Sequence, residues 1–195
     1  LSDGVATSIV DMEQIAFAYI EEIPANSWKI QKTTPTIEEC KIKATKSVSG
    51  LIRNFYNEQS IYTSDIDEVL GVELRCDEWL VINGVDIPLP CHANIDLVLR
   101  LKDEKIVIVD HKTKSKYTDD DELAFVCGKQ AITYIKCFES KTGLKVDEVW
   151  FIENKDSKNK DSSPQLKKFK IVLTEDTRKL YEAILYEPLK RMIEA

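Results

Sequence analysis

The sequence predicts an α/β fold in which one mixed β-sheet is flanked by helices. The expected elements follow the order α-α-β-β-β-α-β-β-α, and helices interrupted in this way must cover the faces of a sheet. Two strongly apolar runs, residues 95–100 and 106–109, are the expected centre of that sheet. The chain has 195 residues, which suits one well-buried domain spanning residues 1–195.

Two helices are expected before the sheet. Apolar residues recur at helical spacing from about residue 8 to 23, and Pro24 ends this pattern. Thr36 and Glu39 fit a capping box, so a second helix should begin there and run to about residue 58. Its middle, residues 47–50, is small and weakly helical. That stretch either permits close packing against a sheet or is a poor helix centre tolerated by tertiary contacts.

Strands are expected from Gly71 onward. Residues 72–82 form the first, and Asn83-Gly84 favours a tight type I′ hairpin turn. The returning residues carry Pro88 and Pro90, which indicate an edge or a bulged stretch before Ile95. The two apolar runs follow, so the centre of the sheet should be an antiparallel meander.

The second half of the chain is expected to alternate between helix and strand. A helix should run from about residue 118 to 140 and stop at Gly143. Residues 145–152 and 166–173 are expected strands, separated by a polar loop. Thr174 should then cap a final amphipathic helix.

Composition indicates an ordinary globular protein, with 43% apolar and 31% charged residues. The net charge of −7 argues against broad non-specific coating of nucleic acid. No apolar run approaches a membrane span, so no membrane partner is expected. Five cysteines without a C-x-x-C pair favour a reducing, intracellular and cytoplasmic setting. The chain begins at Leu1, which suggests a trimmed chain or a fragment of a larger protein.

Acids interrupt both central strands at positions where a buried strand should not tolerate them. If Leu101 pairs with Lys105 around a three-residue loop, Asp96 lies directly opposite Asp110. Directly opposed Cβ atoms are about 4.5–5.5 Å apart, a separation from which two carboxylates can share a divalent cation. Lys112 follows Asp110 on the same strand face. A structural ion pair between Asp110 and Lys112 is the commoner interpretation of so short a motif.

The oxygen-rich site suits Mg²⁺ or Mn²⁺. Magnesium prefers carboxylate, carbonyl and water oxygens at about 2.0–2.1 Å. Asp96 and Asp110 can supply two ligands, and the main-chain carbonyl of His111 can supply a third. Such a metal would polarise a phosphodiester and activate water. Lys112, with a reference pKa of about 10.4, is better suited to neutralising charge on the phosphoryl oxygens than to acting as a base.

A polar pair follows on the expected helix. Gln130 and Tyr134 are four residues apart and therefore share one helix face. A glutamine amide can bond a phosphate or the lysine region, and a tyrosine can stack on a base or donate to a phosphate. Ordinary helix surface is the commoner interpretation of such a pair taken alone.

These motifs, residues 94–98, residues 108–113 and the Gln130/Tyr134 pair, resemble the PD-(D/E)XK nuclease superfamily, specifically its RecB-like exonuclease branch. The matching core covers roughly residues 73–150. The resemblance implies a restriction-endonuclease-like αβββαβ core with extra N-terminal and C-terminal helices. It also implies metal-dependent cleavage of DNA, with Asp96 and Asp110 as ligands, Lys112 catalytic, and Gln130 and Tyr134 binding nucleic acid. Expected partners are DNA and a helicase or other domain of a larger chain or complex, in repair or recombination.

Two features depart from the RecB-like pattern. Those enzymes usually carry a histidine ligand in the preceding helix, whereas the best-placed positions here hold Ser49 and Gly50. The further ligand stays open among four residues: Glu39, Glu58, Glu73 and His92. A structural histidine is the more frequent interpretation of His92. No cysteine follows Cys137, so no iron–sulfur cluster is expected.

The sequence thus predicts a Mg²⁺- or Mn²⁺-dependent deoxyribonuclease, with exonuclease activity implied by the resemblance. The alternative is a catalytically weak or inactive nuclease-like module that binds nucleic acid or a partner protein. The lysine-rich segment 155–170, with a local charge balance of +4, is either a solvated loop or a contact for a nucleic-acid strand.

Overall fold

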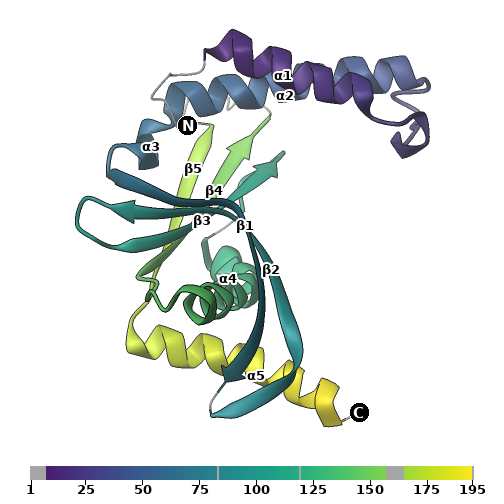
Figure 1. Cartoon of the computed structure of the whole chain (residues 1–195). Helices are drawn as coiled ribbons and strands as arrows, with labels where there is room; N and C mark the ends of the chain where they lie inside the picture. Colours follow the sequence, from purple (N-terminus) through teal and green to yellow (C-terminus); the bar gives the residue numbers. More distant parts are fainter. Residues whose placement is uncertain (1–7, 83, 119, 157–164, 195) are drawn as a thin grey trace. The chain divides into compact units, whose positions relative to one another are not determined.

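A computed structural model of the chain describes residues 8–82, 84–118, 120–156 and 165–194 (Figure 1). The expected order of elements is confirmed, with only two short helical segments added. The elements are α1 (Ile9–Glu22), η1 (Ala25–Ser27), α2 (Ile37–Glu58), α3 (Ser60–Thr63), β1 (Ile66–Ile82), β2 (Val85–Leu101), β3 (Ile106–Lys114), α4 (Asp120–Thr142), β4 (Glu148–Lys155), β5 (Leu166–Val172) and α5 (Glu175–Glu194).

The five strands form one mixed sheet in the order β1-β2-β3-β4-β5. Both β1 and β3 run antiparallel to β2. The amides of Asp147 and Asp156 donate to the carbonyls of Ile106 and Lys114, so β4 runs parallel to β3. Leu173 N donates to Asp147 O, and Lys155 N donates to Gln165 O, so β5 runs antiparallel to β4. The α/β fold is therefore confirmed, and the expected αβββαβ order runs from α2 to β4.

Contacts group the chain into two compact units. The N-terminal unit comprises Leu1–Ser60, Thr113–Lys116 and Asn154–Leu166. The sheet unit comprises Ile61–Lys112, Tyr117–Glu153 and Lys167–Ala195. None of the helices among the described residues is long and apolar enough to span a membrane.

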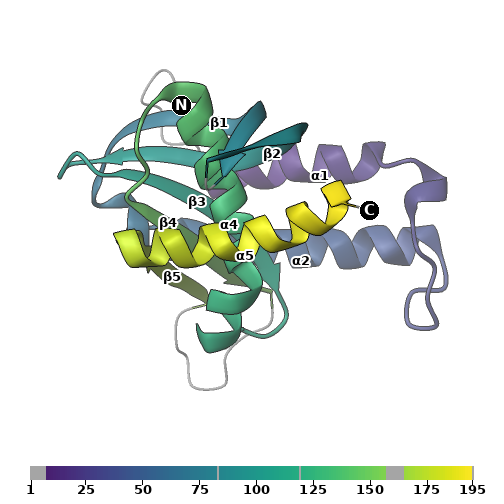
Figure 2. The same cartoon turned by 90° about the horizontal axis from the view of Figure 1, so that it is seen from below.

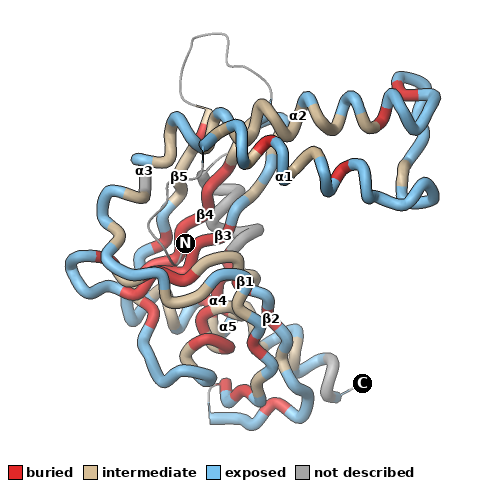
Figure 3. The backbone as a smooth tube through the Cα atoms, turned by 45° about the horizontal axis from the view of Figure 1, so that its top comes forward, coloured by how far each residue is buried: buried red, intermediate tan, exposed pale blue. Residues whose placement is uncertain are grey.

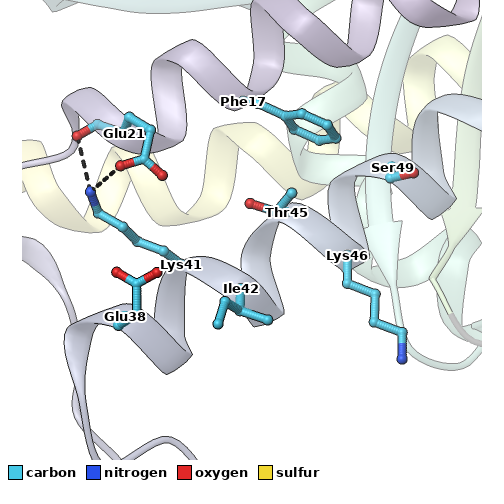
Figure 4. A pocket seen from close by; sticks show the side chains of 8 residues that line it. All are labelled: Phe17, Glu21, Glu38, Lys41, Ile42, Thr45, Lys46 and Ser49. Atoms are coloured by element: carbon cyan, nitrogen blue, oxygen red, sulfur yellow. Dashed lines mark hydrogen bonds and ion pairs between the residues drawn. The ribbon is translucent and has the colours of Figure 1, made fainter.

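The helices of the N-terminal unit begin at capping boxes. Ser8 and Asp11 exchange hydrogen bonds at the start of α1, and Thr36 and Glu39 do so at the start of α2, as the sequence predicts. Between the two helices lies a hollow of about 340 Å³, whose wall includes Phe17 (Figure 4).

Gly50, in the weak centre of α2, makes no close approach to another described residue. A Cβ atom added at Gly50 would meet nothing within 4 Å among the described residues. Ser49 instead donates to the buried carboxylate of Glu13, at 2.5 Å, and Arg53 forms an ion pair with the same group. Of the two expectations for this stretch, the structure therefore favours a poor helix centre held by tertiary contacts.

The first strand is longer than expected. β1 begins at Ile66 rather than at Val72, because its first residues pair with the end of β2 (Ile66↔Leu101) despite their mixed polarity. The tight hairpin is confirmed by the pairing Ile82↔Val85 and by Gly84 at φ +74°. Asn83 lies outside the described residues.

The proline-containing part of β2 is bulged, as expected. The β1–β2 register shifts between Trp79 and Val81, next to the segment that holds Pro88 and Pro90. The described pairing of β2 with β3 extends only from Leu97 to Arg100. The prolines therefore lie in a part of β2 that has no described pairing with β3, so the backbone N–H groups that proline lacks are not needed for hydrogen bonds on that side.

The core of the sheet unit lies between the sheet and α4. All four residues of the run 106–109 on β3 are buried, and β3 is mostly red, the colour of buried residues (Figure 3). Ile106 and Ile108 belong to the same core cluster as the buried residues Ala131, Ile132 and Ile135 of α4. Each fully buried aliphatic side chain of this kind contributes about 1.5–3 kcal/mol. The last helix, α5, packs against α4 and crosses it at a wide angle (Figure 2).

The ends of the later elements mostly match the prediction. Gly143 follows α4 with φ +73°, and Thr174 accepts from Thr177 N at the start of α5. β4 begins at Glu148, three residues later than the expected Lys145. Just before it, the backbone N–H of Val146 donates to the side chain of Glu139 at 2.8 Å rather than to a neighbouring strand.

Candidate active site

The local sequence of β3 places two functional side chains on one face. Its β-branched residues drive the buried strand, which continues through Asp110, His111 and Lys112. Because side chains alternate along a strand, Asp110 and Lys112 share a face. Lys112 Nζ lies 3.1 Å from Asp110 Oδ1 and 2.8 Å from Oδ2.

Asp96 and Asp110 are brought together by the β2–β3 hairpin. Leu101 N donates to Lys105 O at 2.9 Å, which confirms the predicted closure around a three-residue loop. The observed pair Leu97↔Val109 therefore puts Asp96 opposite Asp110 at the next position of the same register. There the regular ladder ends, and the carboxylate of Asp96 accepts from His111 N at 2.7 Å.

The backbone of His111 faces the same edge as Asp96. The carbonyls of Ile106 and Lys114 accept bonds from the segment of β4, so the even-numbered residues of β3 direct their backbone groups toward β4. Odd-numbered residues, including His111, direct theirs toward β2. The amide and the carbonyl of one strand residue point to one side, so the carbonyl of His111 lies on the Asp96 side.

Gln130 and Tyr134 contact Asp110 from α4. Gln130 Nε2 donates to Asp110 Oδ1 at 3.0 Å, and Tyr134 OH lies 3.4 Å from the same oxygen. The two helix residues also bond each other, at 2.6 Å. The shared contact with Asp110 explains the spacing of Gln130 and Tyr134, because residues four apart lie on the same face of a helix.

Burial sets the electrostatics of this cluster. Asp110 is only 1% exposed. Burial raises the pKa of its carboxyl, and the Lys112 ammonium opposes that rise. Burial also raises the pKa of Tyr134, so its hydroxyl keeps its proton. Burial lowers the pKa of His111, while the nearby carboxylates of Asp96, Asp110 and Glu73 act in the opposite direction.

One oxygen of Asp110 is left without a hydrogen bond. Asp110 Oδ2 is buried, and no described group bonds it with hydrogen-bond geometry, although Lys112 Nζ is within ion-pair distance. Burying a carboxylate is costly unless cations and hydrogen-bond donors compensate its charge, and at Oδ2 the Lys112 ammonium alone does so among the described groups. The donor set of two carboxylates and one carbonyl is all oxygen, which fits Mg²⁺ or Mn²⁺. The described residues include no cluster of three or more His, Cys, Asp or Glu side chains that could hold a metal.

The four candidates for a further ligand have different surroundings. Glu39 closes the capping box with Thr36, and Glu58 accepts from Leu166 N at 2.7 Å, both within the N-terminal unit. His92 lies against the carboxylate of Asp77 on the neighbouring strand. Glu73 differs from these three, because the pairs on either side of it in the β1–β2 register place it opposite Asp96.

The backbone at Glu73 is unusual, which sequence reasoning missed. Glu73 has φ +48°, in the left-handed region that residues other than glycine rarely adopt. The strand pattern around it carries no glycine at this position, so nothing in the sequence signals the strain. A second missed contact is the buried Glu153, which accepts from Thr118 N and Oγ1 just before α4.

The chain is similar in fold to a solved structure named as an exonuclease. A "Putative exonuclease" from Eubacterium rectale aligns with 97% of this chain and 68% of its own, at 12% identity and a TM-score of 0.51. An alkaline exonuclease from Laribacter hongkongensis, LHK-Exo, aligns with 97% of this chain and 84% of its own, at 15% identity and a TM-score of 0.37. At such identities the likeness concerns the fold alone.

A third similar structure, SSO0001, aligns with 77% of this chain at 13% identity and a TM-score of 0.39. The aligned region spans 64% of the length of that protein. No family model and no curated protein matches the sequence. The α/β fold of this chain is thus similar to that of an exonuclease-named structure, at the level of architecture.

Proposed function

We propose that the chain is a metal-dependent deoxyribonuclease domain of the PD-(D/E)XK type, in the RecB-like branch. The observation that carries the proposal is the pairing of Asp96 with the buried Asp110, whose Oδ2 lacks a hydrogen bond among the described residues. Lys112, Gln130 and Tyr134 surround the same carboxylate. Similarity to an exonuclease-named fold supports the same class.

Asp96, Asp110 and the carbonyl of His111 would hold Mg²⁺ or Mn²⁺. When bound, such a metal supplies Lewis acidity toward the phosphodiester and lowers the pKa of a bound water. We propose Glu73 as the further acid, because it lies opposite Asp96 and its charge acts on His111. A third carboxylate would compensate for the missing histidine of the RecB-like pattern.

The remaining side chains orient groups and neutralise charge. Lys112 would neutralise the charge that develops on the phosphoryl oxygens, since an ammonium beside a buried site is worth more there than in water. Gln130 and Tyr134 would fix the rotamer of Asp110 through its Oδ1 atom, and neither of them bonds Oδ2. The protonated hydroxyl of Tyr134 can also donate to a strand phosphate.

Digestion of end-labelled single- and double-stranded DNA tests this proposal. We expect cleavage with Mg²⁺ or Mn²⁺ and none with a chelator, and release of mononucleotides or short products from an end would identify an exonuclease. Lys112→Ala and Asp110→Ala should each lose activity by about 100-fold or more. Asp86→Ala, which removes an exposed acid from the far end of β2, is the matched control and should retain activity.

Cleavage that survives both Lys112→Ala and Asp110→Ala, with the fold intact by circular dichroism, would exclude this site. A second candidate function is a catalytically weak or inactive nuclease-like module that binds nucleic acid or a partner protein. The small number of metal-binding side chains at the described site favours it. DNA binding without metal-dependent cleavage by the wild-type chain would support this second function.

A further inference from the structure

A second charged site lies at the opposite end of the central strands. A hollow of about 250 Å³ opens beside the turn between β2 and β3. Lys105, which lines it, precedes Asp110 by five residues, or about 17 Å of extended chain. Four lysines line this hollow together with Trp150 and Glu148: Lys102, Lys105, Lys168 and Lys170. We call it the lysine hollow.

Three of the four ammonium groups have partners. Lys102 Nζ donates to the carbonyl of Ser64 at 2.8 Å, and Lys105 Nζ lies 2.6 Å from Asp103. Lys170 Nζ lies 3.1 Å from the carboxylate of Glu148.

Glu148 itself has little capacity left for another cation. It is only 3% exposed and also accepts from Trp150 Nε1 at 2.8 Å. The carboxylates that line the hollow, those of Asp65, Asp103 and Glu148, are fewer than its ammonium groups.

Lys168 is the exception. Its ammonium lies over the ring of Trp150, 4.3 Å from the centroid. In the part of the chain that the structure describes, this ammonium makes no hydrogen bond or ion pair, although it carries three donors. Burial lowers the pKa of Lys168, and the charge of Lys170 lowers it further, while Asp65 and Glu148 oppose this. A cation that is partly removed from water and lacks an anionic partner favours binding of an anion.

We propose that the lysine hollow binds a phosphate group, with Lys168 as its principal cation. The volume is below the 300–1,000 Å³ or so of typical small-molecule pockets, which suits a compact anion. Phosphate offers several oxygens at once, so Lys168 and the neighbouring Lys170 can donate to one ligand. The phosphate can belong to a nucleic-acid strand or be a free anion.

Titration of the ¹⁵N-labelled protein with inorganic phosphate, at constant ionic strength, tests this proposal. The chain has three tryptophans, and only the indole of Trp150 lines the hollow. We expect a saturable shift of the Trp150 indole resonance, which is assigned by its loss in Trp150→Phe. The resonances of Trp28 and Trp79 should show no matching saturation.

Substitutions identify the binding group. Lys168→Gln should weaken phosphate binding by about tenfold or more, because a charge-assisted hydrogen bond is lost. Lys168→Arg keeps the charge and should retain most of the affinity. Lys145→Gln removes an exposed charge outside the hollow and should leave affinity unchanged. An absent or non-saturable shift at Trp150, or equal affinity in Lys168→Gln, would overturn the proposal.

A second arm distinguishes the two sources of phosphate. A single-stranded oligonucleotide without terminal phosphates is added in the presence of a chelator, so that no cleavage occurs. A Trp150 shift that inorganic phosphate reverses by competition identifies strand phosphate as the ligand. A shift with inorganic phosphate alone identifies a free anion. Neither readout requires nuclease activity, so this proposal and the proposed function can fail separately.

Discussion

Asp110 owes its chemistry to its surroundings. A nearly fully buried carboxylate is unfavourable, and its raised pKa reflects that cost. The contacts from Lys112 and Gln130 hold it at the end of β3 nevertheless. The shared strand face of Asp110 and Lys112 and the shared helix face of Gln130 and Tyr134 were predictable from the sequence, because strand and helix periodicities fix which residues share a face. Their convergence on one oxygen was not, since it depends on where α4 packs.

The further metal ligand was harder to assign, because its candidates were chosen by residue type alone. Glu39 and Glu58 were open as ligands, yet each bonds backbone or hydroxyl groups near it in the N-terminal unit. Glu39 bonds Thr36, three residues away, whereas Glu58 accepts from the backbone N–H groups of Gln165 and Leu166, far along the chain. Composition reveals neither contact. Glu73 was named only as an alternative, and its position opposite Asp96 follows from a register that begins at Ile66.

Glu73 provides a residue-scale prediction. A left-handed backbone at φ +48° costs an L-residue about 1–2 kcal/mol, which glycine avoids. We therefore expect Glu73→Gly to raise the free energy of unfolding by about 1 kcal/mol in urea denaturation. Glu73→Gln, which keeps the strain, should leave it within about 0.5 kcal/mol.

Both Glu73 variants should weaken Mn²⁺ binding in calorimetry if Glu73 acts as the further acid. Destabilisation by Glu73→Gly would contradict the strain argument. Unchanged Mn²⁺ affinity in both variants would exclude the proposed role of its carboxylate.

At the scale of elements, the sequence predicted the type of each long segment but misplaced the start of β1 and both ends of β4. The start of β1 has mixed polarity, and only its pairing with the end of β2 makes it a strand. Residues 145–147 resemble a strand in pattern, but Val146 is held by Glu139 and by Arg178. Long-range pairing thus overrides local pattern at both positions.

Two helical glycines give opposite element-scale predictions. A Cβ at Gly128 would lie 2.9 Å from the buried ring of Tyr181 on α5. Gly128→Ala should therefore destabilise the protein, because overpacking at about 1–3 kcal/mol outweighs the helix propensity gain of about 1 kcal/mol. Gly50→Ala meets no described atom within 4 Å and should stabilise by about 0.5–1 kcal/mol.

Thermal and urea denaturation of these two alanine variants measures both effects. Equal changes in stability, of either sign, would show that helix propensity alone governs the two sites. The matched pair therefore separates the packing of α4 on α5 from the intrinsic cost of glycine.

The bond between α1 and α2 gives a prediction for pH. The hydroxyl of Ser49 is the main cause that lowers the pKa of Glu13, with Arg53 acting in the same direction. A lowered folded-state pKa contributes stability above the unfolded pKa of about 4.3, and this contribution is lost as the pH falls through the folded value. Ser49→Ala should therefore move the midpoint of acid unfolding to higher pH, as measured by circular dichroism.

Ser47→Ala is the control. It also removes a serine hydroxyl from α2, but this hydroxyl bonds Asp156 and not Glu13. An acid midpoint that is unchanged in Ser49→Ala would contradict the assigned role of the Ser49–Glu13 bond.

At the scale of the whole molecule, cations are concentrated despite the net charge of −7. Lys112 lies at one end of the central strands, and the lysine hollow lies beside the β2–β3 turn. In the lysine-rich segment 155–170, the strand expected from residue 166 is confirmed as β5, which begins at Leu166 and carries the last three lysines of the segment. Residues 157–164 of this segment lie outside the described residues. The overall charge alone could not predict this distribution.

The central claim is that Asp96 and Asp110 together hold a divalent cation. Crystals soaked in millimolar Mn²⁺ and measured at the manganese absorption edge test it most directly. We expect one anomalous peak between the two carboxylates, within about 2.0–2.4 Å of their oxygens and of the carbonyl of His111. The peak should vanish in Asp110→Asn crystals. A wild-type crystal with no peak at this position, or with manganese bound elsewhere only, would contradict the claim.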